Sequence, residues 1–264
     1  MQQTGQEDKN HLQRVKDFHD LDASQYRAAR YHSDTCEGLA YITRKELILA
    51  MLDGVSGKVL DIGCGPGILT KDLVDRGLRL FSADLSLEMI KQARSQVSPD
   101  GIGSRAGFVV SDASRICFAQ EKMDTVLCIG LMCYVSDHGR VLSEMGRVLV
   151  PEGLSIIQIN NIRWPSIYRM LVPLYHYLKS KITSKSYDTL NFAFNFSSRK
   201  QFLHDLEKNG FRVHAMEYYD FRIPFVDILF PKLSVKLGKA MFGNRQSRLL
   251  RGFAHGVLIK CSKI

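Results

Sequence analysis

The chain has 264 residues, of which 45% are hydrophobic, and it carries a formal net charge of +9. That length is sufficient for one α/β domain with additions. No apolar stretch reaches the roughly 20 residues of a membrane-spanning helix, and no charged, apolar leader opens the chain, so we expect a soluble, cytoplasmic protein. Six cysteines show no Cys-x-x-Cys spacing and no nearby pair of histidines, which argues against a disulfide framework or a metal site.

The positive charge is concentrated in the second half of the sequence. Residues 1–159 carry 18 Lys or Arg against 21 Asp or Glu, whereas residues 221–264 carry nine against one. This asymmetry suggests an anionic partner that is met through the second half of the chain.

A helix is predicted from about Cys36 to Leu52, and an apolar strand follows that runs straight into a glycine-rich turn. Residues 59–67 read Val-Leu-Asp-Ile-Gly-Cys-Gly-Pro-Gly, and their apolar part is typical of a buried parallel strand. The three glycines allow the backbone to approach a ligand closely, and Pro66 suits the first turn of a helix predicted over residues 68–76. A strand, turn and helix in this order form the ligand-binding unit of doubly wound folds.

The charge at this turn indicates which ligand it accepts. A dinucleotide site would have a third glycine where Ile68 stands, and a phosphate-binding loop would end in Gly-Lys-Ser or Gly-Lys-Thr. Asp61 would also repel a pyrophosphate. An acid beside open backbone instead favours a cationic ligand without phosphates, and S-adenosylmethionine (SAM), with its ammonium and sulfonium groups, fits. The alternative is a tight turn that binds no ligand.

The turn resembles the first motif of the class I SAM-dependent methyltransferases, in which two hydrophobic residues and an Asp precede spaced glycines. The resemblance assigns SAM binding to five residues of the turn: Asp61, Gly63, Cys64, Gly65 and Gly67. It implies an α/β fold with a doubly wound, mostly parallel seven-stranded sheet, and a SAM-binding domain over residues 55–264. It also implies that residues 1–54 form a helical cover over the cofactor.

A second strand, at residues 78–83, ends at Asp84, which lies 21 residues beyond the first glycine of the turn. An acid about 20 residues after such a turn is placed to accept hydrogen bonds from the ribose hydroxyls. Ser86 is predicted to cap the next helix, and the alternative role of Asp84 is that of a capping acid. Two positions of the family that flank the adenine match Leu85 and Met89.

The third and fourth strands end in further candidate positions. After a strand at residues 107–110, the resemblance places Asp112 and Ala113 at the adenine amino group, although an Asp after a strand is also an ordinary turn residue. A fourth strand over residues 123–129 ends at Ile129, where members of the family hold the methyl group and the acceptor.

A fifth strand at residues 155–159 leads into an aromatic-rich segment. Apolar residues at three- or four-residue spacing over residues 164–182 predict an amphipathic helix. This helix is either a lid, within an insertion at residues 162–195 after the fifth strand, or a helix packed in the core. Ser198 is predicted to cap a helix that ends at Asn209, and a strand at residues 211–219 follows.

The segment at residues 223–251 is both apolar and basic. Within it a helix is predicted whose apolar face carries Leu233, Leu237, Ala240 and Met241, beside a face with Lys232, Lys236 and Lys239. Such a helix can lie on an anionic membrane surface. The alternative is a helix docked on the domain with solvated lysines. A last strand at residues 252–260 is antiparallel in the family.

SAM carries an activated methyl group, so the main task of the protein is to align donor and acceptor. A general base is required only where the acceptor loses a proton. The candidates by location are Tyr134 and His138, just past the fourth strand. For His138 the alternative is a surface histidine at the start of a helix predicted over residues 137–149.

The sequence therefore predicts a SAM-dependent methyltransferase that acts on a small hydrophobic or lipid-linked acceptor, with oxygen as the preferred atom. The resemblance is closest to methyltransferases of quinone and natural-product pathways. One alternative is an RNA methyltransferase, although no Asn-Pro-Pro-Tyr motif follows the fourth strand. The other is a SAM-binding regulatory protein without catalysis. Nucleic acid is not an expected partner, and peripheral contact with an anionic membrane stays one of the two alternatives for the basic segment.

Overall fold

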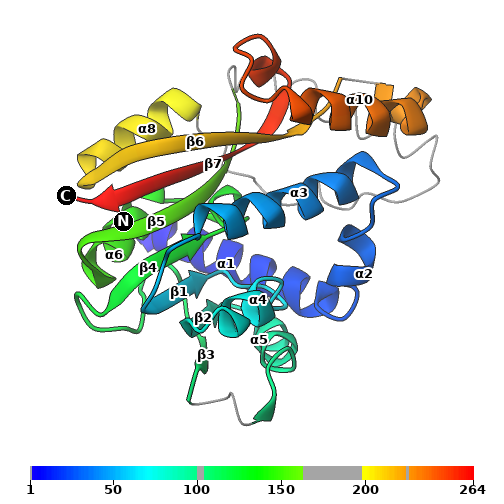
Figure 1. Ribbon diagram of the computed structural model, residues 1–264. Helices are drawn as coiled ribbons and strands as arrows, with labels where there is room; N and C mark the ends of the chain where they lie inside the picture. The colour runs from blue at the N-terminus through cyan, green and yellow to red at the C-terminus, as the bar shows by residue number, and fades with distance from the viewer. Residues whose placement is uncertain (1, 100–103, 163–197, 224–225) are drawn as a thin grey trace.

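The computed structural model describes residues 2–99, 104–162, 198–223 and 226–264 (Figure 1). Its centre is a seven-stranded sheet in the order β3-β2-β1-β4-β5-β7-β6. The strands are β1 (Lys58–Ile62), β2 (Arg79–Asp84), β3 (Ala106–Val110), β4 (Met123–Cys128), β5 (Leu149–Asn160), β6 (Phe211–Phe221) and β7 (Ala254–Lys263). β7 runs antiparallel to both of its neighbours, β5 and β6, and the remaining pairs are parallel. The expected mostly parallel, seven-stranded sheet is confirmed.

Helices cover both faces of this sheet. They are α1 (Gln2–Asp22), α2 (Tyr26–Arg30), α3 (Cys36–Met51), α4 (Thr70–Asp75), α5 (Leu87–Arg94), α6 (His138–Val148), α8 (Arg199–Lys208), α9 (Val226–Leu229) and α10 (Pro231–Gly243). Because alternate residues of a strand face opposite sides, Val59 and Leu127 pack with residues of α3 and α4. Leu60 and Val126 pack on the other face with residues of α6 and α8. This double burial explains the continuous apolar runs of the central strands.

Two predicted boundaries differ from the structure. The helix expected at residue 68 begins at Thr70, because Gly65 and Gly67 have φ of +54° and +74° and keep the chain in a turn up to Leu69. Pro66 therefore lies in that turn and not in a helix. The strand expected at residues 155–159 begins at Leu149, with an irregular register against β4 before regular pairing resumes at Leu154.

The basic helix in the second half of the chain is docked on the domain. α10 packs on α3 and β6, and its buried residues are Ser234 and Gly238. The predicted apolar face is wrong in two of its four members, since Leu233 and Ala240 are exposed. The residues that α10 buries are small instead. At Gly238 the reason is space, because a Cβ there would lie only 3.1 Å from the Phe221 carbonyl oxygen.

The lid predicted within residues 162–195 lies outside the described residues, apart from Ile162. Among the helices that are described, none is both long and apolar enough to cross a membrane.

Candidate active site

The glycine turn is fastened to the end of β2 by hydrogen bonds. The amides of Gly63 and Cys64 donate to the Ala83 carbonyl at 2.8 and 3.1 Å. One oxygen of the Asp84 carboxylate accepts from the Gly65 amide, and the other accepts from the Ser86 amide, each at 2.9 Å. Asp84 therefore holds the turn against β2. Ser86, as predicted, caps α5 by accepting from the Met89 amide.

The three glycines serve different purposes in this turn. A Cβ on Gly67 would lie 2.7 Å from the Ala93 Cα atom, so this glycine allows α5 to pack closely. A Cβ on Gly65 would meet nothing within 4 Å, and its φ of +54° is the reason that a glycine is favoured there. The open space beside Gly65 is where a ligand can approach the backbone.

Asp61 presents a buried acid to this space from the end of β1. The residue is only 3% exposed. Burial raises the pKa of its carboxyl to about 7, and the charge of Asp84 adds to the effect. Within the described part of the chain, no hydrogen bond or ion pair to this carboxylate is formed. A buried carboxylate without a partner favours a cation, which agrees with the ligand charge inferred from the sequence.

A pocket of about 430 Å³, partly open to solvent, connects Asp61 to the N-terminal helices. Its walls are the glycine turn, the end of β4 and one face of α2 and α3. The lining residues are Tyr26, Tyr31, Arg44, Lys45, Ile48, Asp61, Gly63, Cys64, Gly65, Pro66, Ile68, Leu69 and Ile129.

Arg44 of α3 is a pocket residue that the sequence did not identify. Its guanidinium lies 4.6 Å from the ring centre of Tyr41 and near the phenols of Tyr31 and Tyr219. Burial raises the pKa of both Tyr31 and Tyr219, so these phenols are neutral near pH 7 and do not balance the cation. In the described part of the chain, Arg44 makes no ion pair with a carboxylate. No local motif marks this arginine, because its role depends on where α3 is placed.

The pocket therefore carries one acidic and one basic group without counter-charges. The amino-acid end of SAM is a zwitterion, and its ammonium and carboxylate match Asp61 and Arg44 in charge. Lys45 is different, because its ammonium is paired with Asp72 at 2.7 Å. The donor set thus fits SAM.

Most of the remaining predicted cofactor residues lie at or just after the ends of the neighbouring strands β2 and β3, whereas Gly67 lies in the glycine turn and Met89 lies on α5. The Ser111 amide donates to the Asp84 carbonyl, which places the chain after β3 beside Asp84. Asp112 accepts from the amide and the hydroxyl of Ser114, each at 2.8 Å, in the manner of an ordinary turn residue. Six of the predicted cofactor residues do not line the pocket, and their contacts with the cofactor stay predictions. They are Gly67, Asp84, Leu85, Met89, Asp112 and Ala113.

The two candidate bases have different surroundings. His138 is buried and not on the surface, and its Nε2 donates to the Met132 carbonyl at 2.9 Å. Its ring also packs edge-on against Phe202 of α8, 5.6 Å away, and it does not line the pocket. Tyr134 lies in the turn after β4, and burial raises the pKa of its phenol well above the usual range.

His19 of α1 lies beside Tyr134 and was not identified from the sequence. The two rings meet edge-on with their centres 5.0 Å apart. Burial lowers the pKa of His19, while the charges of Asp84 and Asp22 oppose that shift. α1 is held in this position by Asp20, which accepts from the Ser86 hydroxyl, and by His11, which donates to the Tyr134 carbonyl at 2.8 Å. The N-terminal helix therefore reaches the ends of β2 and β4.

Comparison with known proteins agrees with this geometry. Residues 60–157 match the family described as a methyltransferase domain. Methyltransferase GfsG of Streptomyces halstedii is 34% identical over 110 residues, 41% of this chain and 40% of the relative. A ubiquinone biosynthesis O-methyltransferase of Bartonella bacilliformis is 29% identical over 109 residues, 41% of this chain and 43% of the relative. The chain thus matches less than half the length of these two curated relatives.

Solved structures show the same fold at low sequence identity. Magnesium protoporphyrin IX methyltransferase from Synechocystis PCC 6803, solved with bound SAH (S-adenosylhomocysteine), has a TM-score of 0.64 at 16% identity and covers 96% of this chain and 100% of its own. Geranyl diphosphate C-methyltransferase from Streptomyces coelicolor A3(2) has a TM-score of 0.60 at 18% identity, covering 85% of this chain and 79% of its own. Residues 60–157, which include the glycine turn and the ends of β1, β2 and β4, therefore form a methyltransferase domain, and the fold of the chain is that of the SAM-dependent methyltransferases.

Proposed function

We propose that this protein transfers a methyl group from SAM to a small hydrophobic or lipid-linked acceptor, with oxygen as the preferred atom. The observation that carries the proposal is that one pocket beside the glycine turn holds both Asp61 and Arg44, and that among the described residues neither has an oppositely charged partner. Oxygen is preferred because several relatives are named ubiquinone biosynthesis O-methyltransferases. A demethylmenaquinone methyltransferase is also among the relatives.

When bound, SAM supplies a methyl group that is activated by its sulfonium. We assign the ammonium of its amino-acid end to Asp61 and the carboxylate to Arg44. The Asp84 carboxylate lies at the end of the next strand, where a ribose would follow. These contacts would hold the donor in one orientation, and positioning of this kind removes roughly 7–11 kcal/mol of barrier in well-oriented reactions.

Tyr134 and His19 are the groups that we place on the acceptor side. The ring of Tyr134, which follows β4, meets the ring of His19 on α1 edge-on. Burial lowers the pKa of His19, so its imidazole is neutral near pH 7. A neutral imidazole can accept a proton from a hydroxyl acceptor. His138, with its Nε2 donating to a backbone carbonyl, is the weaker candidate of the two that the sequence suggested.

The test has two stages. Calorimetry with SAM and SAH should show binding to the purified chain, and the absence of heat with both would overturn the proposal. A screen with isotopically labelled SAM against quinone precursors, glycolipids, polyketides and total RNA would then identify the acceptor. Label in RNA would favour the RNA methyltransferase alternative, and binding without any transfer would favour the regulatory one.

A further inference from the structure

A group of exposed apolar side chains gathers where α9 meets α10. Leu229, Phe230 and Leu233 are 63%, 59% and 48% exposed. Exposed apolar residues scattered singly are ordinary on protein surfaces, whereas these three lie within five residues of one another. The methyl-transfer site makes no use of these residues.

Unpaired positive charge lies next to this group. Lys232, Lys236 and Lys239 are exposed on the side of α10 that is turned away from the buried Ser234 and Gly238. In the described ranges, none of these three lysines forms an ion pair. Nearby arginines do, since Arg222 pairs with Asp220 and Arg245 pairs with Glu217. We call Leu229, Phe230, Leu233 and the three lysines the α10 surface.

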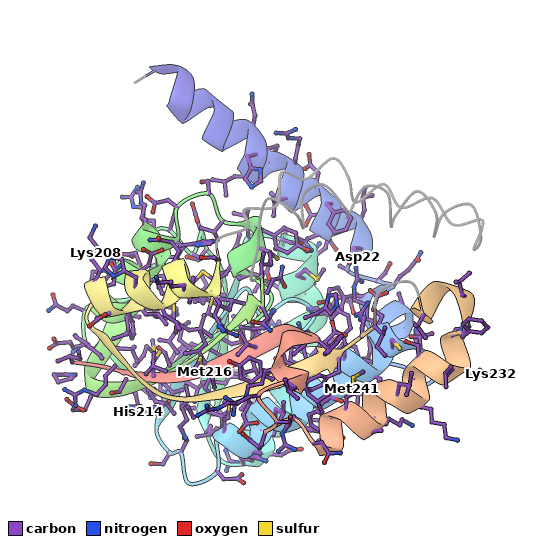
Figure 2. The ribbon with its side chains drawn as sticks, turned by 90° about the horizontal axis from the view of Figure 1, so that it is seen from above. Asp22, Lys208, His214, Met216, Lys232 and Met241 are labelled. Atoms are coloured by element: carbon purple, nitrogen blue, oxygen red, sulfur yellow. The ribbon has the colours of Figure 1, made fainter. Side chains whose placement is uncertain are left out.

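The α10 surface and the pocket both lie toward the edge of the sheet at which the parallel strands have their carboxyl ends. β6 is antiparallel to β7, which is itself antiparallel to β5, so β6 runs in the direction of β1 and β4. α9 begins at Val226, shortly after the carboxyl end of β6 at Phe221. Figure 2 shows Lys232 at the outer end of α10 and Lys208 on the opposite side of the molecule. A partner bound to the α10 surface therefore stands near the carboxyl ends of the strands, where the pocket opens.

We propose that the α10 surface docks the protein on an anionic lipid bilayer. Leu229, Phe230 and Leu233 enter the boundary between headgroups and acyl chains, and the lysines lie against the lipid phosphates. Apolar side chains beside lysines favour a bilayer over nucleic acid, which would require stacking aromatics along a groove. The sequence of residues 223–251 holds six Lys or Arg and one Asp, and this net positive charge is complementary to anionic lipid headgroups. This inference goes beyond the proposed methyl transfer and does not rest on it.

The experiment is co-sedimentation of the full chain with vesicles of phosphatidylcholine containing about 30% phosphatidylglycerol, compared with pure phosphatidylcholine. We expect binding to the anionic vesicles that weakens with added salt. Each lysine near such a surface contributes a factor of about five, so Lys232→Gln, Lys236→Gln and Lys239→Gln together should weaken binding about 100-fold. Phe230→Ser with Leu233→Ser should also weaken it about tenfold, because buried apolar area is lost.

Matched controls come from other faces of the molecule. Lys200→Gln with Lys208→Gln on α8 removes exposed lysines on the opposite side, and Leu87→Ser on α5 removes a side chain that is 46% exposed. Both control proteins should bind as the unaltered protein does. Equal binding to the two vesicle types, no binding to the anionic ones, or full binding by the triple lysine variant would overturn the proposal. SAM calorimetry on the same samples reports the cofactor site separately, so failure of one proposal is distinguishable from failure of the other.

Discussion

Asp61 and Arg44 present opposite charges to one pocket, the carboxylate from the end of β1 and the guanidinium from the middle of α3. In the described structure, neither group has an oppositely charged protein partner. A zwitterionic ligand would satisfy both groups, whereas an uncharged or purely anionic ligand would leave the acid unpaired. The predictions below begin with this pair.

Asp61→Asn should stabilise the protein without SAM and weaken SAM binding. The folded pKa of Asp61, about 7, lies above its ordinary value of 3.8, so folding disfavours the ionised form. The free energy of unfolding therefore falls as pH rises from 3.8 to about 7, and asparagine removes that fall because it does not ionise. The gain should be a few kcal/mol at pH 8 and smaller at pH 5 by urea unfolding. An equal gain at both pH values would contradict this account.

Arg44→Gln should weaken binding of SAM and SAH by about 10- to 100-fold, the effect of losing a hydrogen bond to a charged group. Lys45→Gln is the matched control, because Lys45 lines the same pocket but is paired with Asp72. Calorimetry on both variants measures the difference. Unchanged SAM affinity in Arg44→Gln with a raised acceptor KM would move this arginine to the acceptor site.

Gly67→Ala should destabilise the fold by about 2–4 kcal/mol and abolish measurable SAM binding, because the new Cβ would be forced against the Ala93 Cα atom while φ stays positive. Gly54→Ala is the control for backbone strain alone. Its φ is +78°, and nothing lies within 4 Å of the added Cβ. That variant should lose only about 1 kcal/mol. Similar losses in thermal unfolding of the two variants would contradict the role given to the contact with α5.

His19→Gln should make the protein less sensitive to acid and lower the rate of methyl transfer. Burial lowers the folded pKa of His19 below its ordinary value of 6.5, so the stability contributed by the neutral ring is present above that value and is lost as pH falls through the folded pKa. Urea unfolding at pH 5 and pH 8 measures the difference, with the exposed His204→Gln as control.

For catalysis, the acidic limb of the kcat profile against pH should disappear in His19→Gln, and its persistence would remove His19 from the reaction.

His138→Gln should change stability more than activity. The ring donates to the Met132 carbonyl and packs against Phe202, so its loss costs about 1–3 kcal/mol in a buried position. Because the Nε2 of His138 already donates to the Met132 carbonyl, kcat under saturating acceptor should change less than twofold. A large fall in kcat with normal unfolding would restore His138 as a base.

The identity of the domain and the position of Asp61 and Asp84 were determined by the sequence alone. Strand, turn and helix are local patterns, and the carboxyl ends of neighbouring parallel strands meet at one edge of the sheet, so residues after β1, β2 and β4 could be assigned to one site. The caps Ser86 and Ser198 were predicted for the same local reason.

Only the tertiary structure decided the remaining features. Arg44 and His19 reach the site from helices that precede the first strand, and no spacing along the chain specifies how such helices dock. The burial of His138 depends on Phe202, which is far away in the sequence. On α10, periodicity identified a helix but not its docked face, because close packing against β6 leaves no room for a side chain at Gly238, and Ser234 hydrogen-bonds with Cys36 of α3.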